Sequence, residues 1–343
     1  MRRCTRCILP ETYPDIIFNE EGVCNKCLEY EKKWANRDFE ELRERLKNIF
    51  SWAKKQGKRY DCLVPFSGGK DSTYTLYICR KVYGLKALAV NFNNGLRTIE
   101  SVMNIENSVK KLDVASMCLG LNWGLMRRLY KEFFMKTGQF CFPCDMGIWA
   151  TTQRIAEQMD IPLIVSGFSI QIESRGGKIY SYNQNLFRNI VKNNITTAEQ
   201  KSFLPIEKSQ RIICRLKKLK LTRYRRQISL PDYMEWNDNN IKDTIKREVQ
   251  WDQGKKTGDH VDCLFAPMKN YLVIQKWGFG EKTTKYSAMV RAGQIKREEA
   301  LERVLLEEDT KEKPEVIHSF METLKVSMKD IETAKMKSHL QFL

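Results

Sequence analysis

Short apolar runs alternate with amphipathic stretches through the first half of the 343-residue chain. The runs are rich in β-branched or aromatic residues and have the length of buried strands: 61–66 (DCLVPF), 86–92 (KALAVNF), 114–119 (VASMCL) and 161–167 (IPLIVSG). Between them, apolar residues recur at helical spacing over 71–83, 98–112 and 146–159. This alternation predicts an α/β fold with a doubly wound parallel sheet and crossover helices.

The two ends of the chain have different patterns. Residues 28–56 are charged and helical, 174–202 show little periodicity and predict loops with a short helical lobe, and two amphipathic helices from Thr284 are separated at Gly293. We therefore predict three regions. They are a cysteine-bearing, helical N-terminal segment (1–56), the α/β domain (57–205) and a basic, helical C-terminal region (206–343).

The segment SGGKDS, residues 67–72, lies between the first predicted strand and the first helix. Glycines let the backbone approach an anion, and the first N–H groups of a helix have no partner within it. Lys70 adds a positive charge. The chain lacks the first glycine of a Walker loop, and Asp71 follows the lysine, so a plain kinase or GTPase is disfavoured. The alternative is a Gly-Gly turn without chemistry.

Composition narrows the class of protein. Hydrophobic residues make up 42% and charged residues 29%, as in soluble globular proteins, and the net charge is +17. Such an excess favours anionic partners, among them nucleotides, nucleotide-sugars, RNA and acidic proteins. The sequence shows no long apolar run and begins MRRCTRC rather than with a signal segment, so we expect a cytoplasmic protein without a membrane partner.

Four of the eleven cysteines form two C-x2-C pairs separated by sixteen residues: Cys4, Cys7, Cys24 and Cys27. This spacing is typical of four thiolates around a tetrahedral Zn²⁺. Four protein ligands leave no open position for a substrate, which indicates a structural zinc knuckle. The alternative is four unrelated thiols in a reducing compartment.

A second pair, Cys141 and Cys144, precedes a predicted helix, whose positive end would lower the pKa of both thiols. Cys263 could supply a third thiolate, which would leave one position open on a [4Fe–4S] cluster. The pair could also be a redox or persulfide dithiol, a second structural zinc site or buried neutral thiols. We expect Cys62, Cys79 and Cys118 in the core.

Two further features could either bind a ligand or have only a structural role. Residues 211–226 (RIICRLKKLKLTRYRR) hold eight basic residues, which predict either an anion or RNA surface or a solvated helix face.

In a doubly wound sheet, ligands bind beyond the carboxyl ends of the strands where strand order reverses. SGGKDS, Asn93 to Gly95 and Gly167 would then line one crevice, although Gly167 could be only a strand-end turn.

SGGKDS resembles the signature loop of the PP-loop ATP pyrophosphatases, α/β enzymes that adenylate a carbonyl-type oxygen and release pyrophosphate. The resemblance implies catalytic roles for Lys70 and Asp71, with Asp71 orienting Mg²⁺. It also implies an ATP site made of Phe66, Ser67, Gly68, Gly69, Lys70, Asp71, Ser72, Asn91 and Gly167.

Three further segments resemble one branch of this superfamily, the N-acetyl sugar amidotransferases of bacterial surface-polysaccharide and nonulosonate synthesis: CTRCILPETYPDIIFNEEGVCNKCLEYE, FCFPCDMG and the stretch from Asp259 to Val304. The branch converts an acetamido group of a free or nucleotide-activated sugar into an acetamidino group. It uses ATP and ammonia from a partner glutaminase. The C-terminal region would complete the substrate site. The chain departs from the family pattern at Gly167-Phe168-Ser169, where an acid and an asparagine are expected.

The competing hypothesis is sulfur transfer to RNA, because PP-loop thiolases also adenylate an oxygen and some hold an iron–sulfur cluster with a C-x-x-C pair and a distant cysteine. Cys141, Cys144 and Cys263 fit that plan, as does the positive charge. A zinc-bearing nucleic-acid binder without enzymatic activity would leave SGGKDS unexplained.

Overall fold

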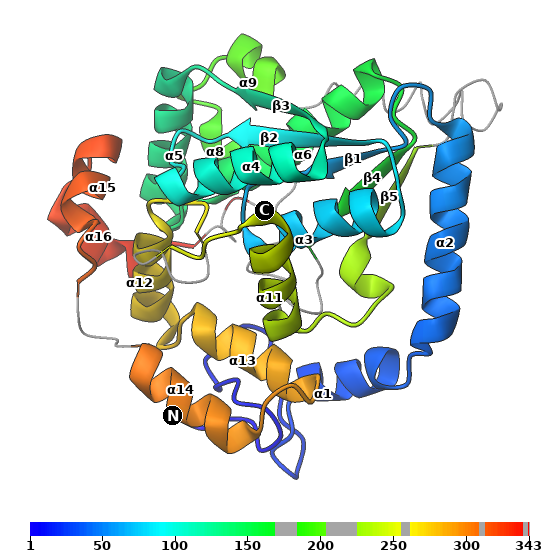
Figure 1. The fold of residues 1–343 in the computed structure, drawn as a ribbon. Helices are drawn as coiled ribbons and strands as arrows, with labels where there is room; N and C mark the ends of the chain where they lie inside the picture. The colour runs from blue at the N-terminus through cyan, green and yellow to red at the C-terminus, as the bar shows by residue number, and fades with distance from the viewer. Residues whose placement is uncertain (169–183, 204–224, 255–260, 309–312, 339–341, 343) are drawn as a thin grey trace.

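The computed structural model describes residues 1–168, 184–203, 225–254, 261–308, 313–338 and 342. At its centre lies a five-stranded parallel sheet with the order β3-β2-β1-β4-β5 (Figure 1). The strands are β1 (Cys62–Pro65), β2 (Ala87–Asn93), β3 (Ala115–Gly120), β4 (Leu163–Ser166) and β5 (Arg226–Ser229). The first four were predicted. The sequence did not predict β5, because Arg226 ends the basic stretch 211–226, of which residues 211–224 lie outside the described part.

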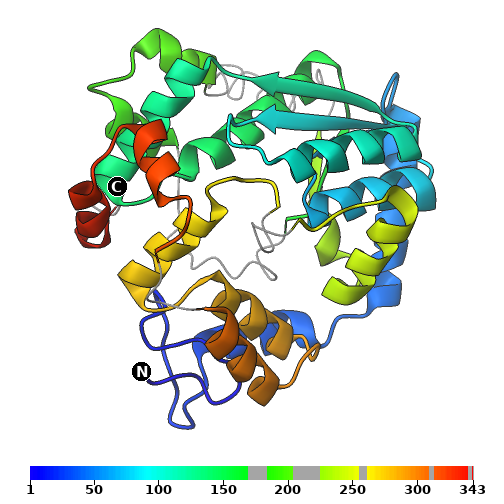
Figure 2. The same ribbon diagram turned by 60° about the vertical axis from the view of Figure 1, so that its left-hand side comes forward.

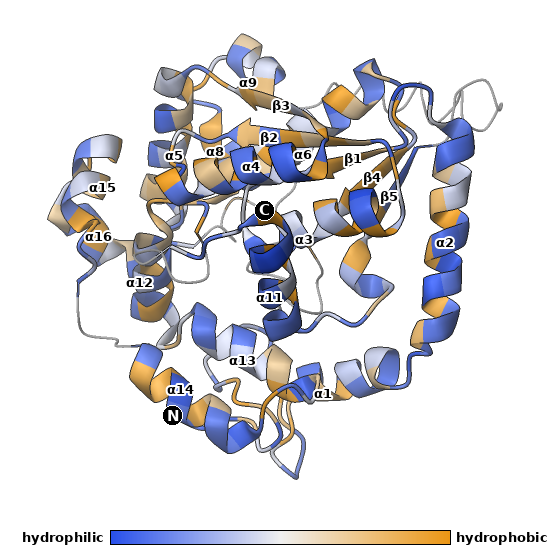
Figure 3. Ribbon diagram, viewed as in Figure 1, coloured by the Kyte–Doolittle hydropathy of each residue, from blue (hydrophilic) through white to orange (hydrophobic). Residues whose placement is uncertain are grey.

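Apolar side chains cover both faces of the sheet. Cys62 and Val64 of β1 face a core shared with α3 (Lys70–Tyr77) and α11 (Asp238–Val249). Leu63, between them, faces α6 (Phe142–Gln158) on the other side. Strands buried on both faces are apolar throughout, as Figure 3 shows for β1 and β4. The predicted doubly wound arrangement is confirmed.

Three further helices begin at a residue whose side chain caps them. Thr98 caps α4 by accepting a hydrogen bond from Ser101 N, and Asp38 and Asn122 cap α2 and α5 in the same way. α6 begins earlier than predicted, because Pro143 suits a first turn. The bounds are α2 (Phe39–Gln56), η2 (Ile78–Val82), α4 (Ile99–Leu112), α5 (Trp123–Thr137), α8 (Gln184–Val191) and α9 (Thr197–Phe203).

The C-terminal region is helical, as predicted, and the break at Gly293 is confirmed. α11 packs against α3 and α4, whereas α13 and α14 pair with each other away from the sheet (Figure 2). The elements are η3 (Leu230–Asp232), α12 (Ala266–Trp277), α13 (Glu281–Arg291), α14 (Arg297–Glu307), α15 (Ile317–Leu324), α16 (Met328–Thr333) and η4 (Ala334–Met336).

Residues 1–24 lie beside α13 and α14, whereas α2, at the end of the predicted N-terminal segment, packs on the sheet core (Figure 1). Residues 1–24 continue into α1 (Asn25–Tyr30) and a π-helical turn, η1 (Glu31–Ala35). Phe279 joins the core around the first four cysteines, and Ile8 packs against α13 and α14. The two ends of the chain therefore share a core, and the predicted division at 56/57 and 205/206 stays a prediction.

The predicted core cysteines differ in exposure. Cys62 and Cys79 are fully buried, as expected, but Cys118 is exposed. The reason is topological, because Cys118 lies on β3, an edge strand whose residues are all exposed. Among the described residues, no helix combines the length and the apolar character needed to cross a membrane.

Candidate functional site

The SGGKDS loop forms a tight strand-to-helix turn, as predicted. Gly68 has φ +79°, and a Cβ there would lie 2.5 Å from the carbonyl oxygen of Ser101, so conformation and space both require glycine. The Ser67 and Ser72 hydroxyls lie 3.3 Å apart, and Ser72 Oγ donates to Gly69 O at 3.0 Å. The loop is thus held by its own side chains, and it leads directly into the N-terminal turn of α3, which suits an anion.

Lys70 lies in a buried cluster of charges. Its Nζ contacts Asp71 Oδ1 at 2.5 Å and Asp238 Oδ1 at 2.9 Å. Burial alone would lower the pKa of Lys70, but the two carboxylates outweigh it and raise that pKa. The lysine is therefore a fixed positive charge beside the loop.

Asp238 joins the loop to the C-terminal region. Besides Lys70, its carboxylate contacts Lys242 Nζ at 3.0 Å and Lys285 Nζ at 3.2 Å. Burial would raise the pKa of Asp238, but the three lysines outweigh it and lower that pKa. Trp236 Nε1 donates to Asp71 Oδ1 at 2.8 Å and so fixes the carboxylate of Asp71, the other acidic partner of Lys70.

The loop, apart from Gly68, lines a cavity of 440 Å³ together with Asp238 and Lys285 of this cluster. The volume is within the range of about 300–1,000 Å³ that small-molecule sites have. The carboxyl ends of β1, β2 and β4 form one side, at the point where strand order reverses. The start of α6, the segment from Asp262 through α13, and Tyr13 form the rest. The crevice predicted from topology is therefore present, with Asn94 and Gly167 in its lining but not Asn93 or Gly95.

The structure gives three other predicted ATP residues specific positions. Phe66 and Gly167 line the cavity. Asn91 is buried, donates to Phe66 O at 2.8 Å and accepts from Arg97 at 3.0 Å, so its side chain joins the ends of β1 and β2. A Cβ on Gly167 would lie 2.6 Å from Asp71 O and from Thr75 Oγ1, so this glycine is required for close packing of β4 on α3.

Cys141, Cys144 and Cys263 line the same cavity from two different elements. Asn94 Nδ2 donates to Cys144 Sγ at 3.3 Å, and Leu264 N bonds Leu96 O at 2.8 Å, which ties the Cys263 segment to the end of β2. The cavity therefore brings Cys263 to the same site as the C-x-x-C pair, and the predicted shared ligand set stays a prediction.

The predicted pKa shift of the pair is wrong. Burial raises the pKa of Cys141, Cys144 and Cys263, the last to about 12. As placed, these are neutral thiols that a bound cation would have to deprotonate.

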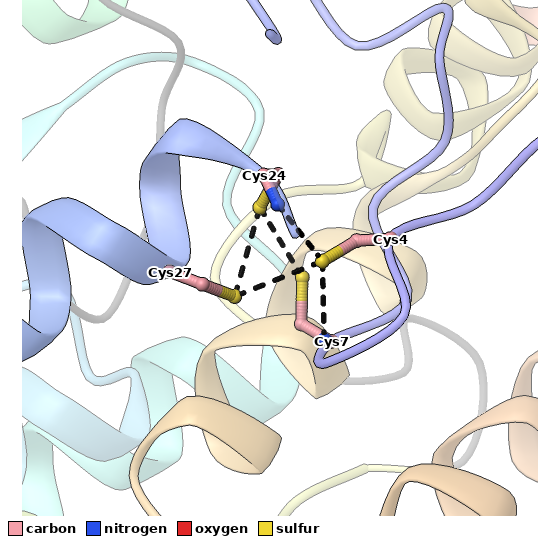
Figure 4. A group of neighbouring side chains, drawn as sticks. All are labelled: Cys4, Cys7, Cys24 and Cys27. Carbon is pink, nitrogen blue, oxygen red and sulfur yellow. Dashed lines mark hydrogen bonds between the residues drawn. The ribbon is translucent and has the colours of Figure 1, made fainter. Parts of the chain in front are cut away.

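The four N-terminal cysteines are buried and converge (Figure 4). Their Sγ atoms lie 3.9 Å (Cys4–Cys27), 3.7 Å (Cys7–Cys24) and 3.6 Å (Cys24–Cys27) apart. A tetrahedron with Zn–S bonds of about 2.3 Å has S–S edges of about 3.8 Å. The donor set therefore fits a metal ion of the size and geometry of Zn²⁺. Within the described ranges, it is the one such group found close enough to share an ion.

Several residues that line the cavity were not predicted from the sequence. They come mainly from the C-terminal region: Arg97, Tyr130, Asp238, Asp262, Lys269, Trp277, Phe279 and Lys285. Lys269 pairs with Glu281 at 2.5 Å, and the Asp262 carboxylate lies 3.5 Å from the position of a Cβ on Gly69. No local motif marks these residues, since only the fold brings them to the loop.

Comparison with known families concerns this same C-terminal side of the cavity. Residues 233–342 match the family described as the C-terminal domain of WbpG-like LPS biosynthesis proteins. That range includes Asp238, Asp262, Cys263, Lys269 and Lys285. The matched domain therefore contributes directly to the cavity that the loop lines.

Two further comparisons are more distant. An uncharacterized protein of Methanocaldococcus jannaschii, MJ1599, is 27% identical over 170 residues, which cover 49% of this chain and 59% of the relative, less than two thirds of its length. The solved U34-tRNA thiolase NcsA from Methanococcus maripaludis, with its [4Fe–4S] cluster, aligns with a TM-score of 0.37 and 12% identity over 91% of this chain and 90% of that chain. A likeness this weak carries no functional argument.

Proposed function

We propose that the protein is an ATP-dependent amidotransferase that converts an acetamido group of a sugar into an acetamidino group during synthesis of a surface polysaccharide. One observation carries the proposal. The SGGKDS loop and residues of the WbpG-like C-terminal domain, Asp238 and Lys285 among them, line one cavity and meet in one charge cluster. A phosphate-type loop and a domain matched to LPS biosynthesis thus serve the same site.

The chemistry proceeds in two steps. The acetamido oxygen attacks the α-phosphorus of ATP, which forms an O-adenyl imidate and expels pyrophosphate. Ammonia then adds to the imidate carbon, and AMP leaves with the original oxygen, which gives the amidine. An amide oxygen is a poor leaving group and AMP a good one, so the first step makes the second accessible.

The residues of the loop would act on the leaving pyrophosphate. Lys70 and the N–H groups that begin α3 would bind its oxygens, because fixed positive charge in a water-poor site stabilises developing negative charge. The carboxylates of Asp71 and Asp262 would hold Mg²⁺, which withdraws charge from the phosphates. Ammonia would come from a partner glutaminase.

The four N-terminal cysteines would hold Zn²⁺ as a structural ion. Such an ion stabilises a segment that has little regular structure of its own. It supplies no chemistry to the proposed reaction, since all four ligand positions would come from the protein.

Pyrophosphate release tests the proposal directly. The purified protein is given ATP, Mg²⁺ and ammonium with UDP-linked acetamido sugars, and in parallel with bulk tRNA and sulfide. We expect AMP and pyrophosphate with the sugars. Lys70→Ala should lower this release by about 100-fold or more, whereas Lys47→Ala, on an exposed position of α2 outside the cavity, should retain most of it. ADP as the product, or full turnover in Lys70→Ala, would refute the proposal.

Sulfur transfer to RNA is the second candidate, favoured by the position of Cys141, Cys144 and Cys263 in the cavity of the loop. Three thiols around one cavity are the donor set of a [4Fe–4S] cluster with one open iron. Turnover with tRNA and sulfide, lost in Cys141→Ser while folding is retained, would favour this reaction. A colourless, anaerobically purified protein with sugar-dependent turnover would exclude it.

A further inference from the structure

The cavity has an aromatic side that the proposed ATP chemistry does not use. Trp277, at the end of α12, and Phe279, just before α13, line it together with Tyr13 from the N-terminal segment. The rings of Tyr13 and Phe279 lie 5.5 Å apart at an angle of 33°, and both side chains are almost fully buried. Trp277 packs on this cluster and is only half-buried, so it offers the larger surface to a ligand.

The indole of Trp277 also has an unused donor. Its Nε1 is buried and has no hydrogen-bond acceptor among the described residues. A buried N–H group without a partner costs free energy, and Trp donors in proteins are usually satisfied. An acceptor oxygen of a ligand in this part of the cavity would remove that cost.

Two lysines that line the cavity are paired with carboxylates, whereas Lys276, whose Nζ lies 5.4 Å from the centroid of the Trp277 ring, donates to Lys337 O. Lys269 is paired with Glu281 at 2.5 Å, and Lys285 with Asp238 at 3.2 Å. Paired charges together with an aromatic surface suit a neutral ring rich in hydroxyl groups, whose C–H face packs on the aromatic ring while its oxygens bond the polar rim.

We propose that Trp277, supported by Tyr13 and Phe279, is the acceptor subsite for the acetamido sugar. The indole packs against the pyranose ring, and Trp277 Nε1 donates to a sugar or acetamido oxygen. This inference rests on the proposed amidotransferase function, because it names where the acceptor of that reaction binds.

The zinc knuckle shapes this subsite. Tyr13 lies between the two cysteine pairs, and Phe279 belongs to the same buried core as the four cysteines. Arg297 of α14 donates to Cys4 O at 3.2 and 3.1 Å and to Cys7 O at 3.0 Å, which fixes the knuckle to the helix pair that carries the cavity wall. Metal bound by the cysteines therefore holds the acceptor side in place, while the ATP side is built separately by β1, β4 and α3.

Binding measurements test the subsite without turnover. The probe is UDP-N-acetylglucosamine, with UDP-glucose as the analogue that lacks the acetamido group, and ATP affinity is measured on the same samples. We expect Trp277→Ala to weaken UDP-N-acetylglucosamine binding at least about tenfold, equivalent to about 1.4 kcal/mol. Trp277→Phe, which keeps a ring but loses the N–H, should weaken it about threefold. Both variants should bind ATP as the wild type does.

The matched control is Trp34→Ala. Trp34 stacks on Arg37 outside the cavity, so its loss should leave both affinities unchanged. Zinc is removed with a chelator, and the chelator is then separated from the protein. This treatment should weaken UDP-N-acetylglucosamine binding about as much as Trp277→Ala does. ATP binding should persist, which shows that the fold survives.

The outcomes separate the two proposals. Binding that depends on Trp277 without any sugar-dependent pyrophosphate release keeps the subsite and rejects the amidotransferase. Pyrophosphate release with an unchanged KM for the sugar in Trp277→Ala keeps the function and rejects the subsite. The subsite also fails if the wild type binds UDP-glucose and UDP-N-acetylglucosamine equally or not at all. Equal loss of ATP and sugar binding on zinc removal rejects the role of the knuckle.

Discussion

Replacing Asp238 by asparagine tests whether the charge cluster joins the loop to the C-terminal region. The Asp238 side chain is 12% exposed, and its carboxylate contacts the ammonium groups of Lys70, Lys242 and Lys285 at 2.9, 3.0 and 3.2 Å. Asparagine keeps the shape and one oxygen but removes the charge. Lys70, whose side chain is 9% exposed, then has only Asp71 of its two carboxylate partners.

The structure sets the size of the effect. Two unit charges 3 Å apart attract by about 5 kcal/mol at an effective dielectric constant of about 20. Desolvation opposes this attraction, and the measured cost of removing one partner of a buried pair is about 3–5 kcal/mol. Lys242 and Lys285 are more exposed than Lys70, at 19% and 24%, and contribute less. We therefore expect the free energy of unfolding to fall by about 3 kcal/mol, the low end of that range.

The effect has a defined pH dependence. The pKa of Asp238 is lower in the folded protein, so its contribution is complete above the unfolded-state value of about 4 and is lost as pH falls below it. Urea unfolding followed by circular dichroism at pH 7 should separate wild type and Asp238→Asn. The separation should shrink as the pH is lowered below about 4.

A surface pair provides the control. Glu248 is 36% exposed and pairs with Arg247, which is 68% exposed, so Glu248→Gln should change the free energy of unfolding by less than about 0.5 kcal/mol. If Asp238→Asn costs no more than this control, the cluster does not join the two regions and the reasoning fails.

Three other predictions follow from local geometry. Gly167→Ala should destabilise the fold by about 1–3 kcal/mol and displace the loop, because the new Cβ meets the backbone of Asp71; unchanged stability and pyrophosphate release would contradict this. Cys118 is the exposed one of the ten described cysteines, so brief alkylation of the native protein, read by mass spectrometry, should label it before the other nine. The purified chain should hold one zinc ion, which Cys27→Ser should lose and Cys62→Ser should keep; equal zinc in both variants would reject the knuckle.

Local pattern was enough to predict the central strands and the loop. Each of the first four strands is an apolar run, and SGGKDS marks its own turn, so no long-range information was needed. β5 is different. It is four residues long, follows a basic stretch and pairs with β4, more than sixty residues earlier. Only that pairing makes it a strand, and a sequence window cannot show it.

Exposure and electrostatics were predicted less well, for a common reason. Cys118 lies in an apolar run, but its strand takes the edge of the sheet, so its side chain is exposed. Cys144 lies in the first turn of a helix, but burial raises its pKa, whereas the helix terminus alone predicts a lowered one. In both cases, the tertiary environment of the cysteine outweighs the local sequence signal.

The two sides of the cavity also differ in how they are built. The side proposed for ATP is local, because β1, the loop and α3 are consecutive in the chain. The side proposed for the acceptor depends on contacts such as Arg297 to the carbonyls of Cys4 and Cys7, and on Glu308, which accepts hydrogen bonds from Gly280 N at 3.1 Å and Thr283 N at 2.7 Å to fix the start of α13. Under the proposed function, a compact motif would bind the nucleotide, whereas the acceptor would be selected by residues that only the folded chain brings together. Substitutions around Trp277 should consequently change which sugar is used before they change whether ATP is cleaved.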